Sequence, residues 1–205
     1  MSTVTEAALL GSPRRWKWTR DFYYGAIEAG LFDENDKVEL LGGELVEEGM
    51  VDRMAPQSPE HASAVDLLGD ALRAAFGSGF RVRVQSPLSL GLDSDPEPDV
   101  AVVRGSPSDY HHHHPAAAEL VVEVSRNSAQ FDRRVKAGLY ASARIPEYWI
   151  VDLTAGVLEV HRDPEPAADV PFEAAYRTVH TLWAQDSVSP LGAPSAEIVV
   201  GGLLP

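Results

Sequence analysis

The chain has 205 residues, of which 44% are hydrophobic and 23% are charged, and its formal net charge is -14. This length suits one domain with a proper core, and no apolar run approaches the ~20 residues of a membrane span. The acidic balance argues against broad nonspecific attraction to nucleic acid, because phosphates repel an acidic surface and counterion release needs clustered cations. Cations do cluster locally, at Arg14, Arg15, Lys17 and Arg20, at Arg81 and Arg83, and at Arg133, Arg134 and Lys136.

The N-terminus has neither the basic start nor the long apolar block of a secretory signal, and the chain has no cysteines for a disulfide framework. We therefore expect a cytoplasmic protein. Residues 1–18 show no pattern of ordered structure and are expected to form a flexible segment. Residues 19–205 are expected to form a single domain.

The first expected helix covers 19–29. Thr19 is a suitable N-cap because its hydroxyl can accept from a free amide of the first turn, and Gly30 is a suitable C-terminal stop. The aromatic residues Phe22 and Tyr23 are placed on the inner side of this helix.

A β-hairpin and a second helix come next. Segments 37–41 and 44–48 flank Gly42-Gly43, a turn that can take positive φ at both positions and is typical of a two-residue hairpin. Ser58-Pro59 then supplies an N-cap and a proline at the first helical position, which predicts a helix that ends at Gly77. The apolar face of this helix is formed by Ala62, Val65, Leu68, Leu72 and Phe76.

Short strands and one further helix account for the rest of the chain. Strands are expected at 80–85, 87–90, 99–103, 120–124, 147–152 and 157–162. A helix is expected over 128–143, and its place between two strands favours a crossover connection in a partly parallel sheet. The last expected strands, which we interpret as a peripheral addition, are at 174–182 and 195–200.

Glu123 is the first candidate site residue. It stands in an apolar run that is typical of a strand buried on both faces, where an ionised carboxylate costs several kcal/mol unless a cation or hydrogen bonds compensate. A structural ion pair with a neighbouring arginine is one explanation. The other is a functional site with Asp99, which starts a second apolar strand, because two carboxylates can hold a divalent metal.

Lys136 is the second candidate. The chain has 17 basic residues, of which Lys17, Lys37 and Lys136 alone are lysines. An ammonium is a compact point charge that can lie against a metal-bound water or a phosphate oxygen. The alternative is a solvated helix lysine. Helical spacing places Lys136 near the edge of the core-facing surface, with Tyr140 one turn later. The expected buried stripe consists of Phe131, Val135, Leu139 and Ser142.

Histidines give weaker signals. The run His111–His114 favours an exposed loop tip that binds Ni²⁺ or Zn²⁺ opportunistically, since adjacent histidines cannot all face one ion. His61 follows a helix start, where it either contributes to capping and packing or points its imidazole into the site. The structural interpretation is slightly favoured.

Several motifs together resemble one family. The sequence reads PEPDV at 96–100, VVEVS at 121–125, DRRVKAGLY at 132–140 and IPEYWIVD at 145–152. These motifs, with EAGL at 28–31, VELLGGELV at 38–46 and SPEH at 58–61, closely resemble the Uma-two family of bacterial proteins described as endonucleases. The resemblance covers most of residues 20–163.

The resemblance implies an α/β fold with a restriction-endonuclease-like core, in which helices flank a mixed central β-sheet and an N-terminal hairpin and C-terminal strands are added. It also implies a PD-(D/E)XK site, in which Asp99 matches the signature aspartate and Glu123 the second acidic residue. Ser125 stands where the wider superfamily has its lysine. In the Uma-two pattern the lysine lies on the following helix, at the position of Lys136.

A site of this type implies a metal-dependent DNA endonuclease that hydrolyses phosphodiester bonds. Asp99 and Glu123 are expected to hold Mg²⁺, with Mn²⁺ as a substitute, while Lys136 orients a water or offsets negative charge. Tyr140 and His61 are expected as accessory residues. The alternative is a catalytically silent nuclease-fold module that binds nucleic acid or protein. Hydrolysis of a smaller phosphate ester fits the charge, but no glycine-rich phosphate loop supports it.

The expected partners are DNA and a second copy of the chain. A homodimer would engage both strands for a double-strand cut. The aromatic and apolar residues that suggest it are Trp16, Trp18, Phe22 and Trp183.

Overall fold

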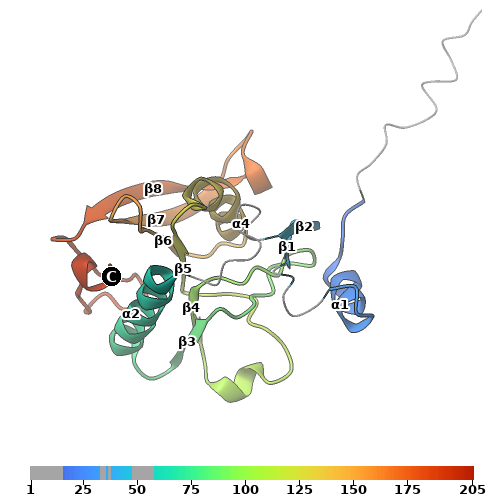
Figure 1. Cartoon of the computed structure of the whole chain (residues 1–205), viewed down its shortest axis with the longest axis horizontal. Coiled ribbons are helices and arrows are strands. Elements are labelled where there is room, and N and C mark those ends of the chain that lie inside the picture. The colour runs from blue at the N-terminus through green and yellow to red at the C-terminus, as the bar shows by residue number, and fades with distance from the viewer. Residues whose placement is uncertain (1–15, 33–35, 37, 48–57) are drawn as a thin grey trace, which may run out of the picture.

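The computed structural model describes residues 16–32, 36, 38–47 and 58–205. Within these residues the chain forms a mixed six-stranded sheet (Figure 1). In spatial order its strands are β3 (Phe80–Val84), β4 (Val100–Arg104), β5 (Leu120–Ser125), β6 (Glu147–Asp152), β7 (Val157–Pro166) and β8 (Ala174–Trp183). β5 and β6 pair in parallel, as the crossover prediction requires, and the other neighbouring pairs are antiparallel.

Helices cover both faces of this sheet. α2 (Pro59–Phe76) packs on one face, and a helical segment that ends in α4 (Ala137–Ser142) packs on the other (Figure 1). Because strand side chains alternate between faces, Val122 contributes to the core under α2 while Val121 contributes to the core under α4. Burial on both faces explains why the central strands are almost continuously apolar. The expected α/β core with flanking helices is confirmed.

The predicted N-terminal elements are present. α1 (Arg20–Glu28) begins after Thr19, whose hydroxyl accepts from the Phe22 amide. Tyr23 is buried, but the expectation that Phe22 also faces inward is wrong, because its side chain is largely exposed. β1 (Val38–Leu41) and β2 (Glu44–Glu47) form the expected hairpin, and Gly42 and Gly43 have φ values of 59° and 78°. Lys37 and Glu48, at the outer ends of the expected strands, lie outside the described residues.

One strand prediction is wrong. Residues 87–90 form no ladder; instead the amide of Leu88 donates to Pro96 O and that of Leu90 to Ser94 O, so the segment closes a loop on itself. The strand expected at 174–182 is present as β8, which pairs with β7 and forms an edge of the main sheet. The expected strand at 195–200 is reduced to β10 (Ile198–Val199), which pairs with β9 (Ser187–Val188). Short 3-10 helices cover Pro107–Tyr110, Pro171–Glu173 and Val200–Gly202.

The helix expected over 128–143 is interrupted by a wider turn. α3 (Ala129–Phe131) leads into a π-helical turn, Asp132–Lys136, which continues into α4. An i→i+5 turn holds more residues than an α turn and changes which side chains face the core. Asp132 and Lys136 are therefore buried. Of the expected stripe, Leu139 is buried, Phe131 and Val135 are half-buried and Ser142 is exposed.

None of the described helices is both long enough and apolar enough to cross a membrane.

Gly138 is a sensitive position for the packing of α4 against the β7–β8 region. A Cβ at Gly138 would lie 2.5 Å from Pro171 O, a backbone atom that cannot move alone. We expect Gly138→Ala to lower the free energy of unfolding by about 1–3 kcal/mol in urea titration. Gly25→Ala is the matched control, because a Cβ on this α1 glycine meets nothing within 4 Å among the described atoms. It should be neutral or stabilising. An equal loss of unfolding free energy in Gly138→Ala and Gly25→Ala would contradict the close approach of Pro171 O to Gly138.

Candidate active site

Asp99 and Glu123 lie at one end of the sheet. Asp99 directly precedes β4, and Glu123 is on β5, the antiparallel neighbour of β4. The Asp99 amide donates to Glu123 Oε2 at 3.4 Å, and the Val124 amide donates to Asp99 Oδ2 at 2.8 Å. The sheet register therefore brings the two carboxylates, 24 residues apart in sequence, next to each other.

Lys136 joins this pair from the π-helical turn. Its Nζ lies 3.1 Å from Glu123 Oε1 and 3.1 Å from Oε2 of Glu39, a residue of β1. The three side chains are almost completely buried, with 2% of the Lys136 side chain exposed. The ammonium thus bridges carboxylates from the hairpin and from the central sheet.

Hydrogen bonds fix both bridged carboxylates. The Tyr140 hydroxyl, one turn after Lys136 on α4, donates to Glu123 Oε1 at 2.7 Å. Burial raises the pKa of Tyr140 well above its usual value, so the phenol remains a proton donor. On the other carboxylate, the Glu97 amide donates to Glu39 Oε1 at 2.6 Å.

The electrostatics of the cluster are dominated by the burial of its acidic groups. Burial raises the pKa of Glu123 well above its usual value; Lys136 opposes this shift, whereas Asp99, Asp132 and Glu39 reinforce it. Burial likewise raises the pKa of Asp132, which accepts from Ser128 Oγ at 2.9 Å. Four acidic side chains therefore surround the buried ammonium of Lys136. They are Glu39, Asp99, Glu123 and Asp132. Such a cluster favours an added proton or an added cation.

His61 reaches the same site from α2. Its Nε2 lies 3.2 Å from Asp99 Oδ2, and its side chain is partly exposed. The Ser58 hydroxyl accepts from the His61 amide, so the backbone of His61 belongs to the helix cap while its ring points into the site. The slight preference for a purely structural His61 is not supported by this geometry. Gln85 completes this side with a 3.4 Å contact from Nε2 to Asp99 Oδ1.

Sequence reasoning missed two members of the cluster. Glu39 stands in the apolar stretch VELL, which carries the same signal as Glu123, a carboxylate inside a buried strand, and could have been found by it. Asp132 gave no such signal, because regular helical spacing did not place it inside. Lys136 was expected at the edge of the core but lies in its interior, because the π-helical turn directs its side chain inward.

A hard divalent cation suits the oxygen donors of this site. Among the described residues, no three or more His, Cys, Asp or Glu side chains are grouped as a protein-only metal cage would require. Mg²⁺ does not need such a cage, since it is usually bound by one or two carboxylates and keeps several waters. Asp99 and Glu123 supply that number of carboxyl groups, and a cation bound there would replace the proton that burial favours on Glu123.

The raised pKa of Glu123 gives a testable pH dependence. Above its ordinary pKa of 4.5, Glu123 loses its proton in the unfolded chain while the folded chain retains it, so the parent protein loses stability as pH rises toward the folded pKa. Glu123→Gln lacks this loss. We expect the unfolding free energy of the variant, minus that of the parent, to increase with pH from about 4.5 in chelator-treated urea titrations.

Asp70→Asn is the control for this measurement, because the Asp70 side chain on α2 is 85% exposed. The unfolding free energy of Asp70→Asn, minus that of the parent, should not change over the same pH range. A flat or falling difference for Glu123→Gln would show that the buried carboxyl is charged throughout.

Comparisons with known proteins bear on the fold and the family of the chain. A protein from Anabaena variabilis, whose crystal structure is described as that of a "putative nuclease belonging to DUF820", superposes with a TM-score of 0.64. The match covers 91% of this chain and 97% of that one at 13% identity, and the fold is restriction-endonuclease-like. No functionally curated protein matches the chain significantly. The model of the Uma2 (Uma-two) family, described as "Putative restriction endonuclease", matches residues 23–199, and the chain belongs to this family.

Proposed function

We propose that this chain is a metal-dependent DNA endonuclease that hydrolyses phosphodiester bonds. Membership of a family described as restriction endonucleases supports a nuclease function. The observation that carries the proposal is the concentration of carboxylates around Glu123, a buried residue whose negative neighbours outnumber the one ammonium bound to it. A buried carboxylate such as Glu123 destabilises the fold unless a proton or a cation compensates its charge.

Asp99 and Glu123 are the residues that would hold Mg²⁺, or Mn²⁺ in its place. The bound ion would supply a water of lowered pKa and offset charge on the phosphate. The protein orients Glu123 for this task, because Tyr140 and Lys136 both contact Oε1 and leave Oε2 on the side of Asp99. The Val124 amide orients Asp99 in the same way.

Lys136 would orient the attacking water or stabilise negative charge that develops on the phosphate. Glu39 prepares it for this role by holding the ammonium against the hairpin, so that Nζ stays beside Glu123. We therefore assign Glu39 as a positioning residue for Lys136. The His61 ring contacts Asp99 from the solvent-exposed side and would influence the charge of that carboxylate.

A catalytically silent binding module is the second candidate, and one observation favours it. The Lys136 ammonium is fully enclosed between two carboxylates, so it must exchange a partner or admit water before it can act on a phosphate. The net charge of -14 points in the same direction, because it weakens attraction to DNA.

Cleavage assays with purified protein separate the two candidates. Plasmid and linear DNA at low salt should be nicked or cut with Mg²⁺ or Mn²⁺, while Ca²⁺ should support binding without turnover. Asp99→Ala and Glu123→Ala should abolish cleavage by removing a metal ligand. Lys136→Ala and Glu39→Gln should retain metal binding in calorimetry and reduce the rate about 10²-fold or more, an effect of the size seen when one charge-stabilising donor is removed.

Asp70→Asn, on the exposed face of α2, should cut at the parent's rate. If the site variants also match the parent, the activity belongs to another site or to a contaminant. If the parent binds DNA or a protein but cuts none of these substrates, the silent-module candidate replaces the nuclease.

A further inference from the structure

Gln85 has a backbone conformation that is unfavourable for a residue with a side chain. Its φ of 44° lies in the left-handed region, which residues other than glycine rarely adopt. Such conformations persist only where the surrounding structure imposes them, and they cluster at functional sites. Gln85 is exposed and directly follows β3, so burial of its side chain in a core does not explain the conformation.

The residue that lies opposite Gln85 is Asp99. The two form the next pair after the end of the β3–β4 ladder. The Gln85 amide donates to Asp99 O at 3.0 Å, and the side-chain Nε2 donates to Asp99 Oδ1 at 3.4 Å. Both the backbone and the carboxamide of Gln85 therefore contact a proposed metal ligand.

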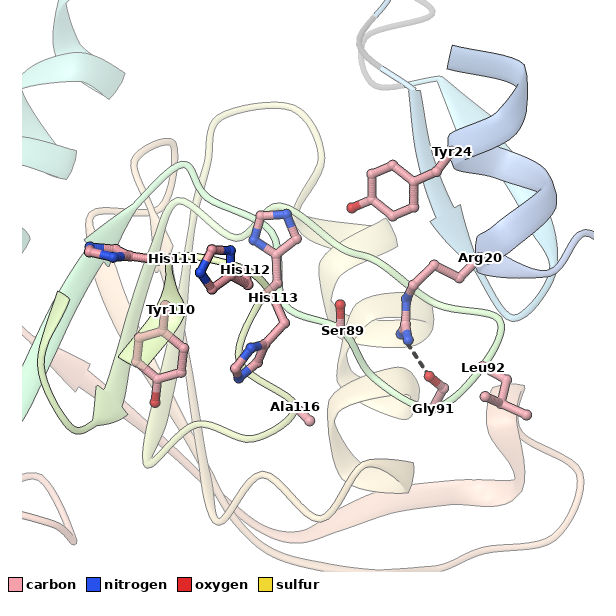
Figure 2. A pocket seen from close by; sticks show the side chains of 11 residues that line it. Arg20, Tyr24, Ser89, Gly91, Leu92, Tyr110, His111, His112, His113 and Ala116 are labelled. Carbon is pink, nitrogen blue, oxygen red and sulfur yellow. Dashed lines mark hydrogen bonds between the residues drawn. The ribbon is translucent and has the colours of Figure 1, made fainter. Parts of the chain in front are cut away.

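The loop between Gln85 and Asp99 is fixed at its far end. The Asp95 amide donates to a carbonyl of β1 at 2.7 Å, and the Asp95 carboxylate pairs with Arg20 of α1 at 2.9 Å. Arg20 also donates to Gly91 O at 2.6 Å, beside a cavity of about 800 Å³ whose opposite wall includes the histidine run (Figure 2). The N-terminal elements thus anchor the loop, and its base holds Gln85 against Asp99.

The carboxamide has a specific place among the contacts of Asp99. Oδ2 is held by the Val124 amide at 2.8 Å and by the His61 ring at 3.2 Å. Among the described residues, Gln85 alone hydrogen-bonds to Oδ1. Groups that hydrogen-bond to a metal-binding carboxylate orient it, and removal of one such group typically costs 10- to 100-fold in metal affinity.

A turn that only connects β3 to β4 would be better served by glycine. Glycine adopts positive φ without a steric cost, because it has no Cβ. A glutamine in this conformation is explained by something that glycine cannot do. The hydrogen bond from its carboxamide to Asp99 is that difference.

We propose that Gln85 is a positioning residue for Asp99, and that its carboxamide holds this carboxylate in the orientation that binds the metal ion. The inference rests on the proposed metal site and adds a residue that lies outside the PD-(D/E)XK signature. It separates stability from function. Glycine at position 85 relieves the backbone and removes the carboxamide, so one substitution should preserve the fold and weaken metal binding.

The test is a calorimetric titration of chelator-treated protein with Mn²⁺ alone, without DNA and at fixed pH. Asp99→Ala defines which part of the heat belongs to the site. Gln85→Gly should raise the Mn²⁺ dissociation constant of this site about 10- to 100-fold, while its urea midpoint equals or exceeds that of the parent. Gln85→Met keeps the side-chain length but has no hydrogen-bond donor. It should weaken Mn²⁺ binding to the same extent without raising the midpoint.

Arg144→Gly is the matched control, because Arg144 is exposed, follows α4 and has a φ of 57°. This substitution relieves the backbone in the same way, and the loss of a positive charge does not weaken cation binding. Its Mn²⁺ affinity should equal that of the parent. In cleavage assays, excess Mn²⁺ should return the rate of Gln85→Gly to that of the parent, since the variant keeps both metal ligands.

Parent-like Mn²⁺ affinity in Gln85→Gly and Gln85→Met would overturn the inference. If these variants bind Mn²⁺ normally but cut slowly when saturated with it, the carboxamide acts on the substrate and not on Asp99. An affinity loss in Gln85→Gly that is absent from Gln85→Met would assign the effect to the backbone and would also overturn it.

Two results for the parent separate this inference from the proposed function. A parent that binds Mn²⁺ through Asp99 but cuts no DNA would refute the nuclease and leave the role of Gln85 standing. A parent whose Mn²⁺ binding is unchanged by Asp99→Ala would refute the metal site and this inference together.

Discussion

The buried contact of the Lys136 ammonium with Glu39 and Glu123 is the interaction on which the rest of the site depends. It joins the N-terminal hairpin, the central strand β5 and the π-helical turn before α4, three elements that are distant in sequence. Removing one partner from a buried ion pair typically costs 3–5 kcal/mol, because the remaining charge stays buried without compensation. The charges of Lys136, Glu39 and Glu123 are therefore compensated only when the hairpin lies against the central sheet.

The π-helical turn is the local device that makes this contact possible. A regular helix would leave Lys136 at the margin of the core, whereas the wider turn directs both Asp132 and Lys136 inward. Turns of this kind are rare and occur frequently at functional sites, where a gain in side-chain placement offsets poorer backbone hydrogen bonding. Here the gain is an ammonium brought within 3.1 Å of two carboxylates.

The sequence predicts the turns and helix starts that neighbouring residues determine. It does not predict features that depend on contacts between distant parts of the chain. Gly42-Gly43 and Ser58-Pro59 each fix a turn or a helix start by themselves, and both predictions are confirmed. The burial of Glu123 follows from its apolar neighbours in β5 and is also confirmed. No local pattern, however, reveals that β8 completes the main sheet or that a π-helical turn reorients Lys136, because each depends on packing against other parts of the fold.

The sequence separation within the cluster has a consequence for folding. Glu39 and Lys136 are 97 residues apart, so their contact closes one of the longest loops in the chain. Non-local contacts of this kind form late, since the entropy of loop closure must be overcome before they contribute. During synthesis the hairpin is made before the helical segment that carries its counter-charge. The contact can therefore form only once the chain has been synthesised through Lys136, so this ion pair cannot hold the hairpin against the sheet before then.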